Sequence, residues 1–172
     1  MLLNKEDLID SWFSTGNSYC KAILCLLAYQ RPKSFSKGSD MILDNSWLVR
    51  SNSRNYHHFF PRAYLSNNGI ENENSIVNIT LVDDYLNKRE ISDKSPSRYM
   101  RKFKKTNPHL KKVMKTHLID NLQEYGVWSD NYDKFLEKLI DFLGPSSLPR
   151  YILALFYSIF LSWEYPFQGP IL

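Results

Sequence analysis

Two adjacent histidines and two asparagines are the residues of this chain whose types and spacing could do acid–base and metal chemistry. His57 and His58 close an apolar, aromatic run that predicts a strand, and Pro61 follows shortly after. Asn78 comes twenty positions after His58, and Asn87 nine positions after Asn78. A neutral imidazole near pH 7 can take a proton from water, and a divalent cation can stabilise charge on a phosphate that is being cleaved.

The segments that hold these residues resemble the HNH (His-Me finger) part of GmrSD-type restriction endonucleases. The matching segments are residues 52–65, 74–81 and 86–99. The resemblance implies an α+β fold in which a metal-binding ββα (HNH) finger is embedded in a mostly helical domain. It also implies cleavage of DNA. Such endonucleases usually carry a nucleotide-using domain ahead of this part. We expect no room for it in 172 residues, so it would be a missing domain or a separate subunit.

The resemblance assigns a role to each of the four residues. His58 matches the general base, and Asn78 matches the residue that pins the loop presenting the base or orients the base itself. His57 and Asn87 match metal ligands. Other interpretations remain open: His58 could be an unreactive histidine, His57 a contact to backbone or DNA, and Asn78 a bulge or strand-end residue.

A divalent ion at this site would be held by two neutral side chains, His57 and Asn87. Because neither offsets the charge of the ion, a substrate phosphate and water would have to complete its shell. Imidazole binds Mn²⁺, Ni²⁺ or Zn²⁺ with higher intrinsic affinity than Mg²⁺. The abundance of Mg²⁺ in the cell nevertheless favours Mg²⁺ as the working ion. Asp83 and Asp84 could add a carboxylate, but their place at the start of a predicted helix favours a role as N-terminal helix charges.

The densest basic run follows the predicted finger. Between Arg98 and Lys115 the chain has eight Lys and Arg residues and no Asp or Glu. Such a surface binds phosphates without reading bases, although for any one residue a solvated helical face is the alternative. The net charge of +4 favours an anionic partner weakly. The residues that we predict to contact nucleic acid are Arg62, Lys88, Arg89, Lys94, Arg98, Arg101, Lys102, Lys104 and Lys105.

The elements that must position these residues follow from hydrophobic periodicity and from breakers. Asn17 or Ser18 could begin a first helix that Pro32 stops. Cys20 and Cys25 lie in this helix, five positions apart. They are predicted to be buried thiols on opposite faces rather than a disulfide. The predicted elements are a helix at 17–31, a strand at 54–60, a turn at 66–69, a strand or loop-to-strand transition at 74–82, and helices at 83–90, 96–104, 107–125 and 132–143.

The length of the chain suits one domain, residues 1–172. We divide it into a helical lead-in at 1–51, the finger at 52–99, and a helical part at 100–172 that is first basic and then apolar. Residues 151–163 carry no charge but are fewer than the roughly 20 that span a bilayer. They predict a buried helix that packs on the domain or on a second copy, and no membrane span. The start of the chain lacks the pattern of a signal peptide, so a cytoplasmic location is expected.

The leading interpretation is a metal-dependent DNA endonuclease of a restriction or phage-defence system. Residue types at the site do not separate DNA from RNA, so a metal-dependent ribonuclease is one alternative. A non-catalytic nucleic-acid-binding module that keeps the fold is the other. Homo-oligomerisation is compatible with all three.

Overall fold

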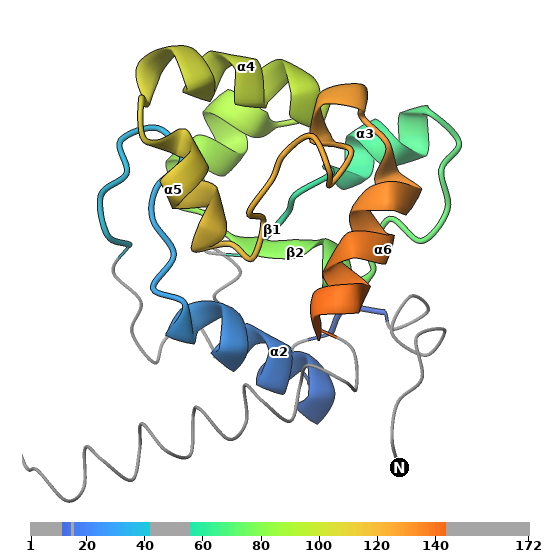
Figure 1. Cartoon of the computed structure of the whole chain (residues 1–172). Coiled ribbons are helices and arrows are strands. Elements are labelled where there is room, and N and C mark those ends of the chain that lie inside the picture. The colour runs from blue at the N-terminus through green and yellow to red at the C-terminus, as the bar shows by residue number, and fades with distance from the viewer. Residues whose placement is uncertain (1–11, 15, 42–55, 144–172) are drawn as a thin grey trace, which may run out of the picture.

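A short antiparallel sheet surrounded by helices forms the centre of the protein in a computed structural model, which describes residues 12–14, 16–41 and 56–143 (Figure 1). The arrangement is α+β, as predicted. The elements are α2 (Ser18–Tyr29), β1 (Tyr56–His58), α3 (Arg62–Asn67), the 3₁₀ turn η3 (Ile76–Asn78), β2 (Ile79–Leu81), the π-helix η4 (Leu86–Ile91), α4 (Pro96–Thr106), α5 (Leu110–Lys115), the 3₁₀ turn η5 (Val127–Ser129) and α6 (Tyr132–Leu143).

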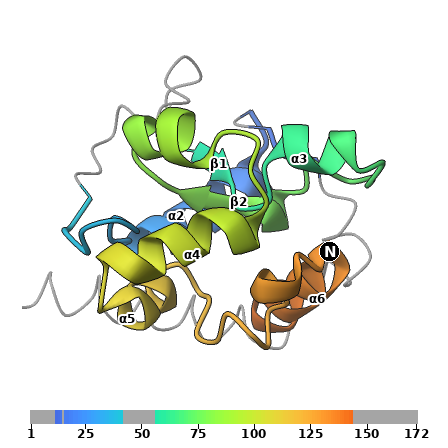
Figure 2. The ribbon, with the colours of Figure 1, turned by 90° about the horizontal axis from the view of Figure 1, so that it is seen from above.

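Strands β1 and β2 pair antiparallel, and His57 lies opposite Thr80 while His58 lies opposite Ile79. The backbone N–H of Phe59 continues the ladder by donating to the carbonyl of Asn78 at 2.8 Å. A two-stranded sheet is at best marginally stable in water by itself, so it needs helices to cover it. In Figure 1, α2 lies on one side of β2 and α4 and α5 on the other. Figure 2 shows α3 and α6 at one end of the molecule and α5 at the opposite end.

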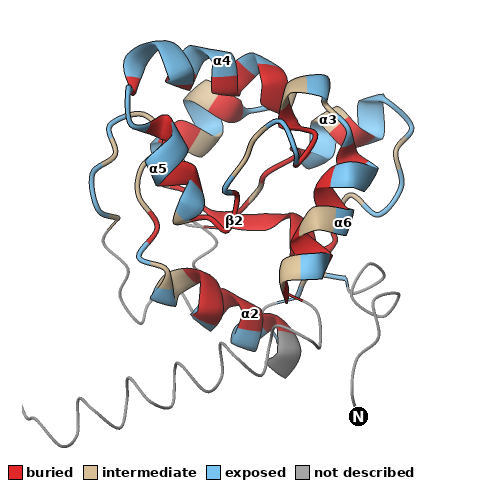
Figure 3. Ribbon diagram, in the orientation of Figure 1, coloured by how far each residue is buried: buried red, intermediate tan, exposed pale blue. Residues whose placement is uncertain are grey.

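An aromatic core holds the bend that follows β1. The Phe59 ring stacks on Phe135 of α6, with centroids 4.8 Å apart and planes at 11°. The Phe60 ring lies 5.2 Å from Tyr132 and 5.0 Å from Phe135. Burying one such side chain contributes about 1.5–3 kcal/mol. The faces that the helices turn inward are buried accordingly (Figure 3). The residues just after His58 are therefore anchored to α6.

Two helices agree closely with the predictions. Helix α6 covers the predicted span, and its predicted apolar stripe is buried. Helix α2 lies within residues 17–31, and the side-chain oxygen of Asn17 accepts from the N–H of Cys20 at 3.4 Å. Cys20 is buried as predicted, but the prediction for Cys25 was wrong, because that thiol is exposed. Five positions do place the two residues on opposite faces, and only one of those faces is covered.

The predicted helix at 107–125 is shorter than expected. Asn107 precedes it, and the Asn107 side chain accepts from the N–H of His109 at 2.9 Å. Helix α5 nevertheless ends at Lys115. Leu118 has a φ of 63°, a left-handed conformation that does not continue an α-helix. His117 is held instead by tertiary contacts, and these end the helix early.

Residues 62–67 form α3, a helix that the sequence-based interpretation missed. The second predicted strand is a loop-to-strand transition, with η3 leading into β2. The predictions for the uncharged tail at 151–163 and for residues 54–55 of the first strand lie outside the described residues. Within the part of the chain that the structure describes, no helix is both long and apolar enough to span a bilayer.

Candidate functional site

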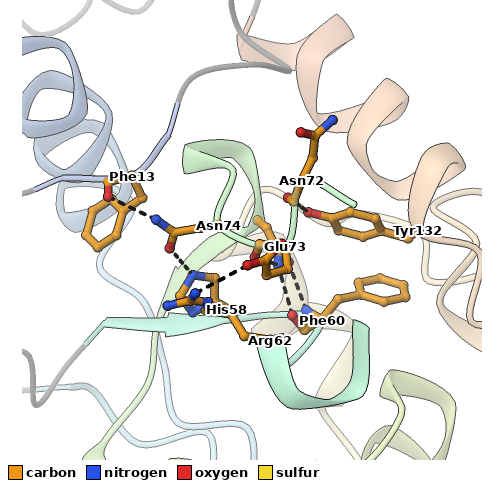
Figure 4. Close-up of polar contacts among 9 residues, drawn as sticks. Phe13, His58, Phe60, Arg62, Asn72, Glu73, Asn74 and Tyr132 are labelled. Carbon is orange, nitrogen blue, oxygen red and sulfur yellow. Dashed lines mark hydrogen bonds and ion pairs between the residues drawn. The ribbon is translucent and has the colours of Figure 1, made fainter. Parts of the chain in front are cut away.

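His58 lies at the end of β1, half-buried, with one ring nitrogen engaged. Its Nε2 is 2.8 Å from the side-chain oxygen of Asn74. Asn74 is itself held by its Nδ2, which donates to the backbone carbonyl of Phe13 at 3.2 Å. Figure 4 shows these residues in a row, with Arg62 and Glu73 alongside His58. The histidine predicted as general base thus sits in a defined polar cluster.

The contacts of Asn74 decide which nitrogen of His58 carries the proton. The Phe13 carbonyl can only accept, so the amide nitrogen of Asn74 faces Phe13 and the amide oxygen faces His58. That oxygen can only accept, so Nε2 of His58 is protonated in the neutral ring. Nδ1 therefore holds the lone pair that could take a proton from water.

The environment of His58 keeps the imidazole neutral near pH 7. Burial lowers its pKa, the hydrogen bond to Asn74 acts in the opposite direction, and the positive charge of Arg62 lowers it again. A general base must be unprotonated to accept a proton, so this direction suits the predicted role.

Asn78 clamps the bend that follows His58. Its side-chain oxygen accepts from the N–H of Phe60 at 2.8 Å, and its Nδ2 donates to the Phe60 carbonyl at 2.9 Å. The same Nδ2 lies 3.3 Å from the carbonyl of Glu73. Asn78 is fully buried, so these bonds are shielded from water. These contacts fix the backbone of the bend that follows His58.

His57 occupies a different environment from His58 although the two are adjacent. It is only 6% exposed, and its Nε2 is buried without a hydrogen-bond partner among the described residues. Burial, with a smaller contribution from His58, lowers its pKa to about 3, so the ring is neutral. Successive strand residues point to opposite faces, and directly paired residues share a face. His57 therefore lies on the Thr80 face of the hairpin.

A second buried histidine, which the sequence-based interpretation missed, lies on the Thr80 face. The Nδ1 of His117 is 2.9 Å from the Thr80 hydroxyl, and its Nε2 donates to the carbonyl of Lys33 at 2.8 Å. Burial lowers the pKa of His117 to about 4. Because its Nε2 must donate to a carbonyl, its Nδ1 accepts from the hydroxyl of Thr80. His117 thus joins the segment after α5 to β2 and to the loop after α2.

Asn87 lies on η4, the first helix after β2, whereas α3 and η3 lie between β1 and β2. Its carbonyl accepts from the N–H of Ser92 at 2.8 Å, which gives the wide i→i+5 turn of a π-helix. Such turns are rare and occur often at functional sites. The hydrogen bonds of His58 and Asn78 lead to Asn74, Phe60 and Glu73. The convergence of Asn87 with the histidines therefore stays a prediction.

The two aspartates before η4 act as helix-start residues. The Asp83 carboxylate accepts from the N–H of Leu86 at 2.9 Å, and Asp84 pairs with Lys88 at 2.9 Å. These contacts agree with the favoured interpretation of both residues. Among the described residues there is no group of three or more His, Cys, Asp and Glu side chains that could hold a metal ion. A metal ion bound by His57 and Asn87 would be coordinated by the imidazole of His57 and the amide oxygen of Asn87. Water or substrate would have to supply its other ligands.

The predicted nucleic-acid contacts fall into paired and exposed groups. Arg62 pairs with Glu73 at 3.3 Å, Lys102 pairs with Glu90, and Lys94 donates to the Glu90 carbonyl at 2.7 Å. The Lys104 ammonium lies 5.4 Å from the centroid of the Trp128 ring. Exposed ion pairs contribute about 0–1 kcal/mol, so they can be exchanged for phosphate at little cost. The predicted contacts that are exposed in the structure are Arg62, Lys88, Arg89, Arg98, Arg101, Lys102, Lys104 and Lys105.

Part of this chain is similar to an archaeal protein. No family model matches the chain, and no solved structure matches it. A stretch of 90 residues is 37% identical to an uncharacterized protein of Methanocaldococcus jannaschii. That stretch covers 51% of this chain and 14% of the archaeal protein, so the chain spans only a small part of this relative.

Proposed function

We propose that this chain is a metal-dependent endonuclease of the HNH type that hydrolyses phosphodiester bonds of DNA. The observation that carries the proposal is the state of His58. Its Nε2 is held by Asn74, its Nδ1 keeps the lone pair, and it lies beside the bend that Asn78 clamps. The resemblance of residues 52–99 to restriction endonucleases supports a role in defence against foreign DNA as part of this proposal.

In this mechanism His58 takes the proton of the attacking water on Nδ1. The ring then becomes a cation whose Nε2–H still donates to the oxygen of Asn74, so the new charge is stabilised where it forms. Asn78 has no part in the proton transfer. It keeps the backbone after His58 in place, and a rigid bend keeps the base aligned with the water.

His57 and Asn87 are the residues that would hold the divalent ion. The buried Nε2 of His57 has no protein partner in the described residues, and its pKa of about 3 leaves it unprotonated, as a metal ligand must be; it lies on the opposite face of the hairpin from His58, so binding one ion beside both would need a change at the end of β1. When bound, a divalent ion stabilises charge on the phosphate and on the departing 3′ oxygen. With two neutral protein ligands, the affinity for the ion would depend on the substrate phosphate.

The exposed basic face of α4 and α5 would hold the DNA backbone. The buried residues of α4 include Tyr99, Met100 and Phe103, and its Lys and Arg residues lie on the outer face. Such contacts are independent of sequence and weaken steeply with salt. Target choice would then rest with a nucleotide-using domain or subunit outside these residues.

Plasmid nicking tests the proposal directly. Purified protein is incubated with supercoiled plasmid and with Mg²⁺, Mn²⁺ or Ni²⁺, and His58→Ala is run in parallel. We expect metal-dependent nicking that the variant loses while it still binds DNA. Nicking by the variant at the wild-type rate would show that His58 is not the base.

A non-catalytic nucleic-acid-binding module is the second candidate. The absence of a group of three charged or imidazole donors in the described residues favours it. In that case the wild type and His58→Ala would bind plasmid equally, and neither would nick it with any of the metals. A ribonuclease would instead cut an RNA of the same sequence and leave the plasmid intact.

A further inference from the structure

An exposed indole lies next to the His58 cluster. Trp12 keeps 59% of its surface exposed, and the following residue, Phe13, provides the carbonyl that orients Asn74. The rings of Phe13 and His58 meet edge to face, with centroids 6.5 Å apart. Large aromatic side chains are usually covered, so an exposed one at this place invites a functional explanation.

The backbone around Trp12 is fixed, so the indole does not belong to a loose loop. Trp12 forms an isolated bridge with Ser75, and the N–H of Phe13 donates to the Asn74 carbonyl at 2.8 Å. The Cys20 thiol of α2 lies 3.8 Å from the Trp12 carbonyl. These contacts join the backbone of residues 12 and 13 to Asn74, which orients His58, and to Ser75.

A guanidinium lies over this indole. The Cζ atom of Arg62 is 5.9 Å from the centroid of the Trp12 ring, within the range of a cation–π contact. Glu73 holds the other side of Arg62 at 3.3 Å, and the Arg62 side chain is half exposed. The same Arg62 contributes to the lowered pKa of His58. Trp12, Arg62 and His58 thus belong to one surface region.

We propose that Trp12 and Arg62 form a stacking platform for an unpaired nucleobase beside the phosphate that is attacked by the water His58 deprotonates. The inference rests on the proposed nuclease function and adds its substrate class: single-stranded DNA, or duplex DNA with an unpaired nucleotide at the cleavage site. Within a duplex, both faces of each base are covered by neighbouring pairs, so only an unpaired base can lie on an indole. Stacking of this kind is tolerant of sequence because every base has a π-face.

The surroundings of Trp12 favour a nucleobase over a protein partner. Protein interfaces use contiguous apolar patches of several hundred Å². Here the described neighbours along the chain, Ser14, Gly16 and Asn17, are exposed and are small or polar. One aromatic ring with a cation over it matches a flat base with a phosphate close by.

The test measures binding, so that it does not depend on cleavage. In a His58→Ala background, anisotropy of labelled oligonucleotides gives the affinity for a single strand and for the duplex of the same sequence. Trp12→Ala should weaken single-strand binding about 5- to 150-fold, the range for loss of one base–aromatic stack, and leave duplex binding within twofold. Trp12→Phe should keep most of the affinity. Tyr29→Ala removes another exposed aromatic side chain and should change neither affinity.

Several outcomes would overturn the platform. Equal losses for single strand and duplex, or no loss for either, would show that Trp12 does not read unpaired bases. Preferential binding of an RNA strand that depends on Trp12 would assign the platform to RNA. A Trp12-dependent dimer with unchanged DNA affinity would make the indole an interface with a second copy. Absence of metal-dependent nicking by the wild type would refute the nuclease function but leave the Trp12-dependent affinity difference as a separate result.

Discussion

The two faces of the β1–β2 hairpin treat adjacent histidines in opposite ways. On one face, His58 is half-buried and has a side-chain partner that is itself held in place. On the other, His57 is sealed, and its Nε2 has no partner among the described residues. Both rings are neutral near pH 7 because burial lowers both pKa values. A neutral imidazole alone therefore does not identify a general base. The fixed tautomer of His58, in a half-buried ring, distinguishes it from His57.

The largest expected effect is the loss of the base on the His58 face. His58→Ala should lower kcat for plasmid nicking about 10²- to 10⁴-fold, the usual contribution of general-base catalysis. Its circular dichroism spectrum and melting temperature should stay close to wild type. His109→Ala, at an exposed histidine before α5, is the matched control and should nick normally. Equal loss in both variants would remove the distinction between His58 and any other histidine.

Removing the clamp beside His58 should reduce both stability and rate. Asn78→Ala leaves the buried N–H and carbonyl of Phe60 without their side-chain partner. Each unsatisfied buried group costs about 1–3 kcal/mol. We expect the free energy of unfolding in urea to fall by several kcal/mol, with lower kcat in the fraction that remains folded. A variant with full stability and lower activity would instead place Asn78 in the chemistry.

On the opposite face, replacing His57 should separate stability from metal dependence. The His57 pKa of about 3 lies below the unfolded value near 6.5, so the unfolded state binds the extra proton. Wild-type stability should therefore fall as the pH drops below 6.5 and level off near pH 3. His57→Leu should lose that part of the acid destabilisation and gain about 1–3 kcal/mol at pH 7, because a buried orphan nitrogen is removed.

The nicking activity of His57→Leu tests whether His57 affects the metal dependence of the reaction. If His57 is a metal ligand, the variant should need a higher Mn²⁺ concentration for half-maximal rate, and excess Mn²⁺ should restore part of the activity. An unchanged metal requirement would make His57 a purely structural residue of the Thr80 face.

A carboxylate in place of Asn74 should move the pH profile without removing the base. Asn74→Asp can still accept from Nε2 of His58, but its negative charge favours the imidazolium and raises the His58 pKa. The acid limb of kcat against pH should therefore shift to higher pH. Asn74→Ala, which frees the tautomer, should lower the plateau instead. If both variants had the same pH profile as the wild type, Asn74 would not act through His58.

The smallest effect concerns the basic side chains of helix α4, which are exposed to solvent, unlike the histidines on the two faces of the hairpin. Neutralising Arg101, Lys102, Lys104 and Lys105 should weaken binding to DNA of any sequence. Each lost phosphate contact lowers the log–log salt slope by about 0.9 on duplex DNA, and we expect about two contacts to be lost because the four side chains spread around the outer face and cannot all point into one groove. An unchanged slope would show that this face is only solvated.

Local patterns predicted several elements well. Helix α6 follows from apolar residues at helical spacing, and the start of α2 from Asn17. A strand that ends at the histidines also agrees with the structure, as does the loop-to-strand transition before β2. All depend on neighbours within a few positions, where the 3.6-residue and two-residue periods operate. The same argument predicted that Cys20 and Cys25 lie on opposite helix faces.

By itself, the sequence determined that a short strand ends at His57 and His58 and that a loop-to-strand transition contains Asn78. Only the tertiary structure decided that Asn74 holds Nε2 of His58, because the Phe13 carbonyl that orients it lies 61 positions away. It also decided that α5 ends early, since His117 binds Thr80 and Lys33. Periodicity describes which residues face one way along an element. It does not say which distant group will meet them, and the protonation of a histidine depends on that partner.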